Sequence, residues 1–215
     1  MELPVIVIGG GGHAKVLVST LLLRRRYLLG FVDLNLALPP LLGISHLGTD
    51  SAVFKYLPGQ VELVNGIGSV SCARNRQGVY DRFVEKQYRF ATVIHPSAVV
   101  ATEVEIESGV QIFAGAVVQP GCRLGANAIV NTGARVDHDC IVESHAHVAP
   151  GVTLCGAVQV GSGAHIGAGA TVIQGVRIGA GSVVGAGALV IRDVPQGVTV
   201  IGVPAASMRE GATAR

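Results

Sequence analysis

The sequence predicts an α/β N-terminal half-Rossmann domain followed by a left-handed parallel β-helix of hexapeptide repeats. Of the 215 residues, 30 are glycine, 49% are hydrophobic and only 4% are aromatic. This composition is typical of stacked aliphatic layers and not of a core built on aromatic rings. Branched aliphatic residues recur at every sixth position of the C-terminal half, and a strand, a glycine-rich turn and a helix are expected before that repeat begins.

The first part of the chain has the pattern of half a doubly wound α/β unit. A short buried strand is expected at residues 4–9, a glycine turn and then a helix at 13–27, and a second strand at 30–33. A third strand is expected at 60–66 and a polar helix at 72–87. The pattern ends near residue 91, where we place the boundary between two domains.

The hexapeptide repeat runs from Ile94 to Val190, where every sixth residue is Ile, Leu or Val, and the residue four positions further on is small or β-branched as far as Val194. Neither a helix nor a simple strand generates this period. Three hexads make one triangular coil of eighteen residues, so residues eighteen apart should stack at the strand spacing of about 4.8 Å. The expected domains are therefore 1–91 for the α/β domain, 92–203 for the β-helix and 204–215 for a C-terminal tail.

Charge and hydropathy exclude several classes of partner. A net charge of +2 is too small to indicate the basic surface that binds nucleic acid. The one basic run, Arg24 to Arg26, is interpreted as the solvated end of a helix. Every apolar stretch is interrupted well before the roughly 18 residues of a membrane-spanning helix. No signal peptide is recognised, and the four cysteines show no disulfide pattern. These features predict a cytoplasmic protein that binds neither nucleic acid nor membrane.

Self-association is expected from the scarcity of charge in the repeats. Residues 144–191 contain one charged side chain, Arg177. So neutral a surface is expected to be covered by other copies of the chain, because large exposed apolar faces are rare on soluble monomers. A three-sided prism suits threefold symmetry, and the sequence therefore predicts a homotrimer with its sites at the seams.

The glycine turn near the N-terminus is the first candidate site. Residues 9–14 fit a relaxed G-x-G-x-x-A pattern, and a carboxylate follows at about the twenty-residue offset expected of an acid that binds a ribose. A dinucleotide needs two such halves and only one precedes the repeats, so one nucleotide is favoured over two; a purely structural turn is the other alternative. The residues expected at this ligand are Gly9, Gly10, Gly11, Gly12, His13 and Asp33.

The second candidate site is the segment Asp137-His138-Asp139. Because residues eighteen apart should stack, His138 is expected near a corner of the prism with Gly156 directly above it. A histidine beside carboxylates can act as a general base, and the N–H of a glycine one strand away could stabilise an oxyanion. A solvated turn histidine is the alternative.

Other histidines and cysteines suggest a metal site or a nucleophile. His147 and His165 also differ by eighteen and should stack, and with His138 and His145 they could ligate zinc at a subunit seam. Their spacing is not that of a compact metal site, so no metal is expected. Cys140 follows the second candidate site like a nucleophile, but it occupies an inward small position above Cys122 and is expected in the core.

In these motifs the chain resembles the sugar O-/N-acyltransferase family of the hexapeptide-repeat superfamily. That family includes sialic acid O-acetyltransferases and N-acetyltransferases acting on nucleotide-linked 4-amino-4,6-dideoxy sugars. The resemblance rests on the opening VIGGGGHAKV, the strand end FVD, the entry TVIHPSAVV, the segment NTGARVDHDC with the following HVAPGV, and the closing GVTVIGVPA. VDHDC after a GGGGHAK start is more specific than the hexads, which place the chain only in the superfamily.

The resemblance implies a role for each matching residue. It implies that His138 is the catalytic base, that Asp139 orients it and that Asn131 lies near the reacting group of the sugar. It also implies that His147 lies along an acetyl-CoA groove and that the N–H of Gly156 meets the thioester carbonyl.

The function implied is an N-acetyltransferase that uses acetyl-CoA as co-substrate and acts on a nucleotide-linked, UDP-type 4-amino-4,6-dideoxy sugar by direct transfer. An O-acetyltransferase acting on sialic acid or another sugar hydroxyl is the close alternative. A zinc enzyme of the γ-carbonic anhydrase kind and a non-enzymatic β-helix that binds an effector are the rivals from other classes.

The course of the cofactor is expected to follow the stack above Gly156. Gln174 and Arg192 continue that stack at intervals of eighteen residues, along coils rich in glycine and alanine. The guanidinium of Arg192 could meet a CoA phosphate, or it could cap the last full coil. The expected cofactor contacts are His147, Gly156, His165, Gln174 and Arg192.

Overall fold

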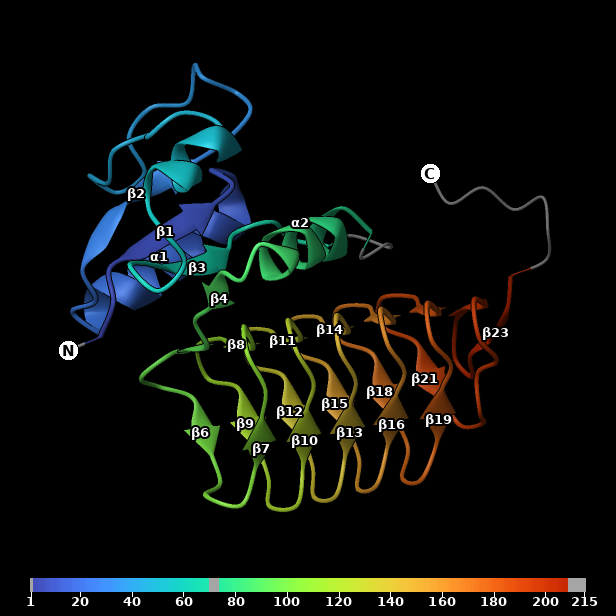
Figure 1. The fold of residues 1–215 in the computed structure, drawn as a ribbon. Helices are drawn as coiled ribbons and strands as arrows, with labels where there is room; N and C mark the ends of the chain where they lie inside the picture. Colours follow the sequence, from blue (N-terminus) through green and yellow to red (C-terminus); the bar gives the residue numbers. More distant parts are fainter. Residues whose placement is uncertain (1, 70–73, 209–215) are drawn as a thin grey trace.

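The computed structural model describes residues 2–69 and 74–208. They form a small parallel α/β domain followed by a β-solenoid of about six turns (Figure 1). An α/β domain followed by a solenoid of hexads is the architecture that the sequence predicts, and this part of the prediction is confirmed.

The N-terminal domain is a four-stranded parallel sheet with the strand order β2-β1-β3-β4. Its elements are β1 (Val5–Ile8), α1 (Gly12–Leu23), β2 (Leu28–Val32), the 3₁₀ helix η1 (Asp50–Lys55), β3 (Glu62–Asn65), α2 (Arg74–Glu85) and β4 (Arg89–Phe90). All four residues of β1 are apolar and buried, as expected for a central strand covered on both faces. The three expected strands and both helices are present, whereas η1 and β4 had no counterpart in the sequence pattern.

Helix α1 is shorter than expected, and of the three arginines at its end Arg24 and Arg25 are exposed, as expected, whereas Arg26 is not. The helix ends because Arg25 adopts a left-handed backbone conformation with φ of 53°. The side chain of Arg26 is only 10% exposed and its guanidinium pairs with Glu62 at 2.7 Å. Arg24 donates a hydrogen bond to the carbonyl of Ile94 at 3.0 Å, so it reaches the solenoid.

Among the described residues, no helix is long and apolar enough to cross a membrane.

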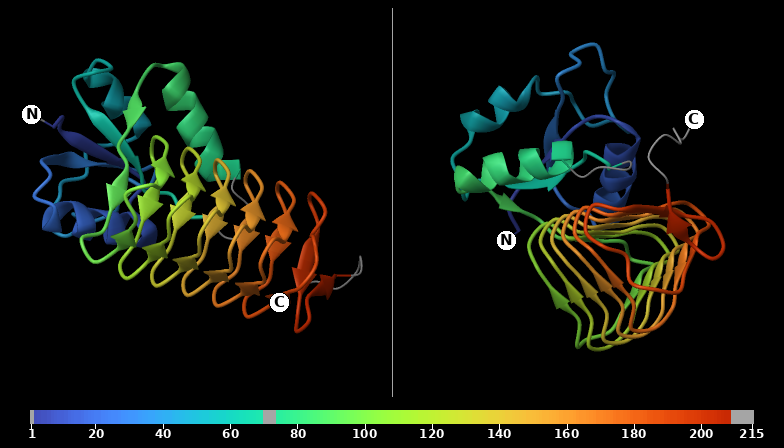
Figure 2. Two further views of the ribbon diagram at one scale, coloured as in Figure 1. Left: turned by 90° about the horizontal axis from the view of Figure 1, so that it is seen from below. Right: turned by 90° about the vertical axis from the view of Figure 1, so that its right-hand side faces the viewer.

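The solenoid is built of short strands that stack into three sheets, which the chain visits in turn (Figure 2). The first sheet holds β5 (Val93–Ile94), β8 (Gln111–Ile112), β11 (Ile129–Val130), β14 (His147–Val148), β17 (His165–Ile166), β20 (Val183–Val184), β22 (Thr199–Ile201) and the antiparallel β23 (Ala206–Ser207). The second holds β6 (Val99–Val100), β9 (Val117–Val118), β12 (Arg135–Val136), β15 (Thr153–Leu154), β18 (Thr171–Val172) and β21 (Leu189–Val190). The third holds β7 (Glu105–Ile106), β10 (Arg123–Leu124), β13 (Ile141–Val142), β16 (Gln159–Val160) and β19 (Arg177–Ile178).

Stacking at intervals of eighteen residues is confirmed along most of the solenoid. Val136 pairs with Leu154 and His147 pairs with His165, each eighteen residues further on. The repeated aliphatic side chains point inward and are almost all buried, which gives the prism a continuous core. Cys140 is also fully buried in this core, so its assignment to the inward small position is confirmed.

The register changes by two residues in the last turn. Val172 pairs with Val190, eighteen residues on, but Ile178 pairs with Val194, only sixteen residues on. The expectation of an unbroken frame is therefore wrong after Val190. The inward residues Val190 and Val194 are separated by three residues, whereas five separate the inward residues of the earlier hexads. Arg192 therefore lies in a shortened turn and is not in register with Gln174.

The N-terminal domain lies on the first sheet of the solenoid, at its early coils (Figure 2). Val93, Phe113 and Ile129 of the solenoid belong to one buried cluster with Leu17 of α1 and Val7 of β1. The corner between the second and third sheets lies opposite the first sheet and therefore remains uncovered by this domain. This arrangement decides which side chains can meet within one chain.

Replacement of Gly161 by alanine is expected to destabilise the protein by about 1–3 kcal/mol. A Cβ there would lie 2.6 Å from the amide nitrogen and 2.9 Å from Cα of Ala180 in the next coil, so the two coils would have to separate. Gly78→Ala on α2 is the matched control, because a Cβ there meets nothing within 4 Å, and it should be neutral or stabilising by up to about 1 kcal/mol. Urea unfolding measures both variants; equal free energies of unfolding would contradict the close stacking.

Candidate functional site

The glycine turn and the start of α1 border an open pocket of about 490 Å³. Helix α1 has no side-chain cap at its N-terminus and no acidic residue in its first turn, so its first backbone N–H groups remain available to an anion. The pocket is lined by Gly9, Gly11, Gly12, His13, Asp33, Gly66, Ile67 and Gly68. Five of the six residues expected at the first candidate site therefore come together here.

Gly10, the sixth expected residue, does not line the pocket but packs against side chains behind the glycine turn. A Cβ at this position would lie 2.6 Å from Cδ1 of Leu38 and 2.7 Å from Cε2 of Phe31. Its N–H donates to Oδ2 of Asp33 at 2.7 Å, and Oδ1 of the same carboxylate accepts the N–H of Asn35 at 2.8 Å. Asp33 therefore holds the shape of the turn in addition to lining the pocket.

His13 is neutral and forms a hydrogen bond with the solenoid. The side-chain Nε2 of Gln111 donates to the carbonyl of Asn65 at 2.8 Å, which turns its Oε1 toward His13, whose Nε2–H donates to it at 2.7 Å. Burial, together with the positive charge of Arg76, lowers the pKa of His13 to about 4. The remaining ring nitrogen, Nδ1, is an acceptor near Gly68.

His138 and Asp139 form an exposed pair at the corner between the second and third sheets. Nδ1 of His138 donates to Oδ2 of Asp139 at 2.8 Å, with the two side chains 61% and 68% exposed. This hydrogen bond raises the pKa of His138, with the charge of Asp137 adding to it, and it leaves the lone pair of the neutral ring on Nε2. Asp139 has φ of 59°, and a Cβ on Gly121 would lie 2.4 Å from its Oδ1. The pair can therefore act as an oriented base.

Gly156 accommodates the ring of His138. A Cβ at position 156 would lie 2.6 Å from both Cε1 and Nε2 of that ring. His138 and Gly156 belong to one column of residues eighteen apart. The other positions of this column are not restricted to glycine, since Pro120 and Gln174 occupy two of them. Pro120 has no N–H, so the coil does not need a donor there, and among the described residues the N–H of Gly156 has no acceptor. The ring of His138 thus lies against a residue whose N–H has no acceptor among the described residues.

Asn131 and His147 lie elsewhere, below the N-terminal domain. Oδ1 of Asn131 accepts the N–H of Thr132 at 2.8 Å, which directs its Nδ2 to Nε2 of His147 at 3.0 Å. Nδ1–H of His147 then donates to Ser69, whose Oγ lies 2.7 Å away. Burial lowers the pKa of His147 to about 3. Both ring nitrogens are used within the chain, so His147 offers neither to a cofactor.

The ring of His165 meets that of His147 edge-on, with ring centroids 4.9 Å apart, and its buried Nδ1 has no partner in the described part of the chain. Burial lowers the pKa of His165 as well. Within one chain, the described residues contain no group of three or more His, Cys, Asp or Glu side chains that could hold a metal ion.

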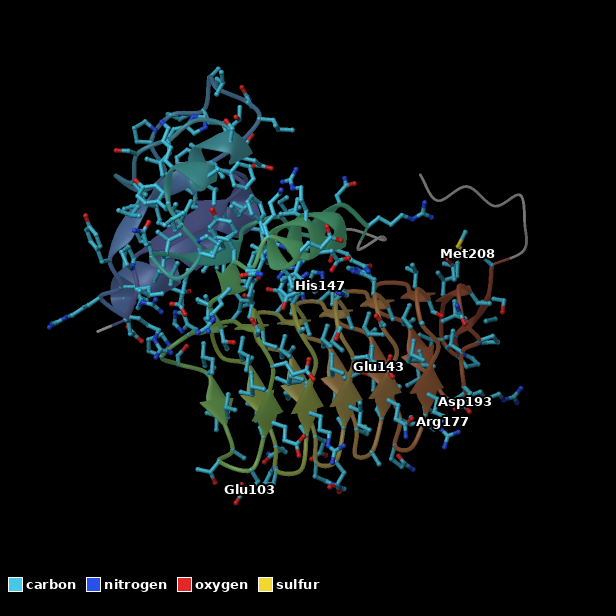
Figure 3. All side chains as sticks on the ribbon, in the orientation of Figure 1. Glu103, Glu143, His147, Arg177, Asp193 and Met208 are labelled. Atoms are coloured by element: carbon cyan, nitrogen blue, oxygen red, sulfur yellow. The ribbon has the colours of Figure 1, made fainter. Side chains whose placement is uncertain are left out.

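The expected site residues therefore fall into two groups on different sides of the chain. The corner group comprises His138, Asp139, Gly156 and Gln174; the first-sheet group comprises the pocket residues with Asn131, His147 and His165. Figure 3 shows His147 under the N-terminal domain and Glu103, which lies in the column of Asp139, at the far edge of the prism. One chain alone does not bring the two groups together.

Three polar residues that hold the pocket in place were missed by the sequence pattern. Gln111 could have been found, because it lies in the same outward column as His147 and His165. Ser69 and Arg76 could not have been found in this way. One is a serine in a loop and the other an arginine in a polar helix, and the sequence does not indicate which distant segment either of them contacts.

Three family models match the chain. The PglD N-terminal domain matches residues 4–83, the hexapeptide repeat of succinyl-transferase matches residues 120–144, and the bacterial transferase hexapeptide (six repeats) matches residues 157–192. Together they cover both domains of the structure.

Several solved structures are similar over nearly the whole chain. PerB from Caulobacter crescentus, in complex with CoA and GDP-perosamine, is 38% identical, covers 96% of this chain and 97% of that chain, and has a TM-score of 0.88. The acetyltransferase domain of PglB from Neisseria gonorrhoeae FA1090, in complex with acetyl coenzyme A, is 32% identical, covers 97% and 100%, and has a TM-score of 0.90. WeeI from Acinetobacter baumannii AYE, 23% identical with 96% and 100% covered and a TM-score of 0.85, shares the fold. No curated protein sequence matches the chain.

Asp139→Asn is expected to lower the pKa of His138 toward the ordinary histidine value of about 6.5, because the hydrogen bond to Asp139 is the main cause that raises it. The ring would then become neutral, and able to accept a proton, at a lower pH than in the unchanged protein. An NMR titration of the histidine Cε1–H signals measures this. Glu103→Gln, at the same corner two coils away, is the control and should leave the pKa unchanged; an equal pKa in both variants would reject the pairing.

Proposed function

Because this chain belongs to the PglD-like family of hexapeptide-repeat sugar N-acetyltransferases, we propose that it transfers the acetyl group of acetyl-CoA to the amine of a nucleotide-linked amino sugar. The sugar is of the 4-amino-4,6-dideoxy class. The sequence favours UDP as the nucleotide, whereas PerB was solved with GDP-perosamine, so both nucleotides belong in the assay.

The observation that carries this proposal is the geometry of His138. Its ring is held by Asp139 at 2.8 Å and lies against Gly156, whose N–H has no acceptor among the described residues. A base and an oxyanion donor in adjacent coils suit attack of an amine on a thioester.

The reaction is a direct transfer in a ternary complex. The amine nitrogen adds to the thioester carbonyl while Nε2 of His138 takes its proton. The N–H of Gly156 stabilises the resulting oxyanion, and the C–S bond breaks as the carbonyl re-forms. The leaving thiolate, whose conjugate acid has a pKa of about 8.5, needs little help from an acid, so one histidine suffices. Asp139 orients the ring and stabilises its protonated form.

The site is completed by a second copy of the chain. The corner group supplies the base, and the first-sheet group supplies the nucleotide pocket with Asn131, but these lie on different sides of one prism. In a threefold assembly each corner can face the first sheet of its neighbour. The nearly uncharged surface of residues 144–191 supports such packing, since Arg177 is its one charged side chain.

Acetyl-CoA is proposed to lie in the same seam, with its thioester at Gly156 and its arm toward Gln174. His165, whose buried Nδ1 lacks a partner, lines the first-sheet side of the seam. The change of register after Val190 leaves Arg192 out of this column, so a contact between Arg192 and a CoA phosphate is not part of this proposal.

His138→Ala is expected to lower kcat by about 100-fold or more, because it removes the general base, while the affinity for acetyl-CoA changes little. Steady-state kinetics with UDP- and GDP-linked 4-amino sugars, together with calorimetry of CoA binding, measures both. His95→Ala is the control, because this histidine lies in an exposed turn of the solenoid, where it bonds Ser97 at 2.8 Å. Unchanged turnover in His138→Ala would reject the proposed base.

Mixed assemblies test whether the site is shared between copies. Gly12→Glu places a carboxylate at the start of α1, where no atom lies within 4 Å of the new Cβ, and should abolish nucleotide binding by repulsion. Co-expression of Gly12→Glu chains with His138→Ala chains should restore about a quarter of the activity in random trimers, because a quarter of the seams then combine two intact halves. Each variant alone stays inactive. No recovery in mixed assemblies would place both halves of the site in one chain.

A further inference from the structure

Arg76 of α2 is a fully buried cation without a carboxylate partner among the described residues. Its Nη1 donates to the carbonyls of Asn65 at 2.8 Å and Ile67 at 2.6 Å, and its Nη2 donates to the carbonyl of Asn127 at 3.4 Å. Its Nε has no partner. Burial lowers the pKa of Arg76 to about 9, so the guanidinium remains charged at neutral pH. A buried charge that lacks a counter-charge is costly.

The other buried arginine of this domain is paired differently. Arg26, with a side chain 10% exposed, contacts Glu62 at 2.7 Å and Glu2 at 3.1 Å. Its role is explained by these two carboxylates. Arg76 differs from Arg26 because no carboxylate among the described residues neutralises its charge. This difference is therefore specific to the location of Arg76.

Arg76 lies directly behind one wall of the nucleotide pocket. The wall consists of Gly66, Ile67 and Gly68, and the guanidinium holds the carbonyls of Asn65 and Ile67 from the side away from the pocket. On the pocket side, a Cβ on Gly9 would lie 3.3 Å from Cγ1 of Ile67, so the wall abuts the glycine turn. One layer of peptide thus separates the cation from the cavity.

The charge of Arg76 acts on groups that line the cavity. It contributes to the lowered pKa of His13, which lines the pocket, whereas Arg76 does not. The one carboxylate that lines the pocket, Asp33, already accepts two backbone N–H groups. The positive end of the α1 dipole and the charge of Arg76 therefore both act on the cavity, although no cationic side chain lines it.

We propose that Arg76 is the buried counter-charge of the diphosphate of the nucleotide sugar, acting across the wall formed by Gly66, Ile67 and Gly68. This inference rests on the proposed function, which places a nucleotide sugar in this pocket. Arg76 does not touch the ligand; it positions the wall and attracts charge through a medium of low polarity, where charges interact strongly over several ångströms. It therefore selects a nucleoside diphosphate over a monophosphate.

Calorimetry of the full chain with UDP, GDP, UMP and GMP tests the inference. Arg76→Gln should weaken binding of the diphosphate by about tenfold or more and binding of the monophosphate by clearly less, whereas Arg76→Lys keeps the charge and should retain most of the preference. The affinity for acetyl-CoA should not change. The pKa of His13, measured by NMR, should rise in Arg76→Gln because a nearby positive charge is removed. Arg26→Gln is the matched control and should lower stability without changing nucleotide affinity.

A second variant keeps the test decisive if Arg76→Gln does not fold. Asn127→Asp introduces a carboxylate next to the guanidinium, at a residue whose φ of 58° suits Asp as well as Asn, and the new oxygen can accept a hydrogen bond from His145. It should weaken diphosphate binding by supplying an internal counter-charge. Unchanged affinity for the diphosphate in Asn127→Asp or in folded Arg76→Gln would overturn the inference, as would equal losses for diphosphate and monophosphate. If the unchanged protein binds none of the four nucleotides, it is the proposed function that fails.

Discussion

The main-chain stacking of one coil on the next is the constraint on which the rest of the structure depends. Parallel pairing at intervals of eighteen residues fixes which side chains are neighbours along the prism. It therefore places the ring of His138 against Gly156, and it makes the absence of a side chain at Gly156 part of the site. It also fixes which sheet carries the N-terminal domain and which corner stays open. The chemistry of the corner is a consequence of backbone geometry.

The parts of the molecule that follow from a repeating backbone could be predicted from the sequence. The hexads predicted the core, the buried position of Cys140 and the neighbours of His138, because a strict period converts sequence spacing directly into distance. The glycine turn predicted most of the pocket for a similar reason, since a strand, a turn and a helix leave few arrangements open. The prediction failed after Val190, where two residues are missing from the period.

Contacts between the two domains could not be predicted, because they join segments without a common period. The hydrogen bonds from Arg76 to the carbonyl of Asn127, from His147 to Ser69 and from His13 to Gln111 each join a loop or helix of the N-terminal domain to the solenoid. The resemblance also implied that His147 lies along a cofactor groove; in the structure its Nδ1 bonds Ser69 of the N-terminal domain and its Nε2 bonds Asn131 of the solenoid. Polar side chains at such a junction have the same appearance in the sequence as ligand-binding ones.

The altered last turn bears on how these molecules can associate. A stack of identical coils presents, at its end, unpaired backbone groups that could template another chain, which is the hazard of any exposed strand edge. Here the change of register between Ile178 and Val194 breaks the repeat, and β23 pairs antiparallel with β22 to cover the edge of the first sheet. The prism is thereby protected from end-to-end polymerisation into fibres and is left free to associate through its sides.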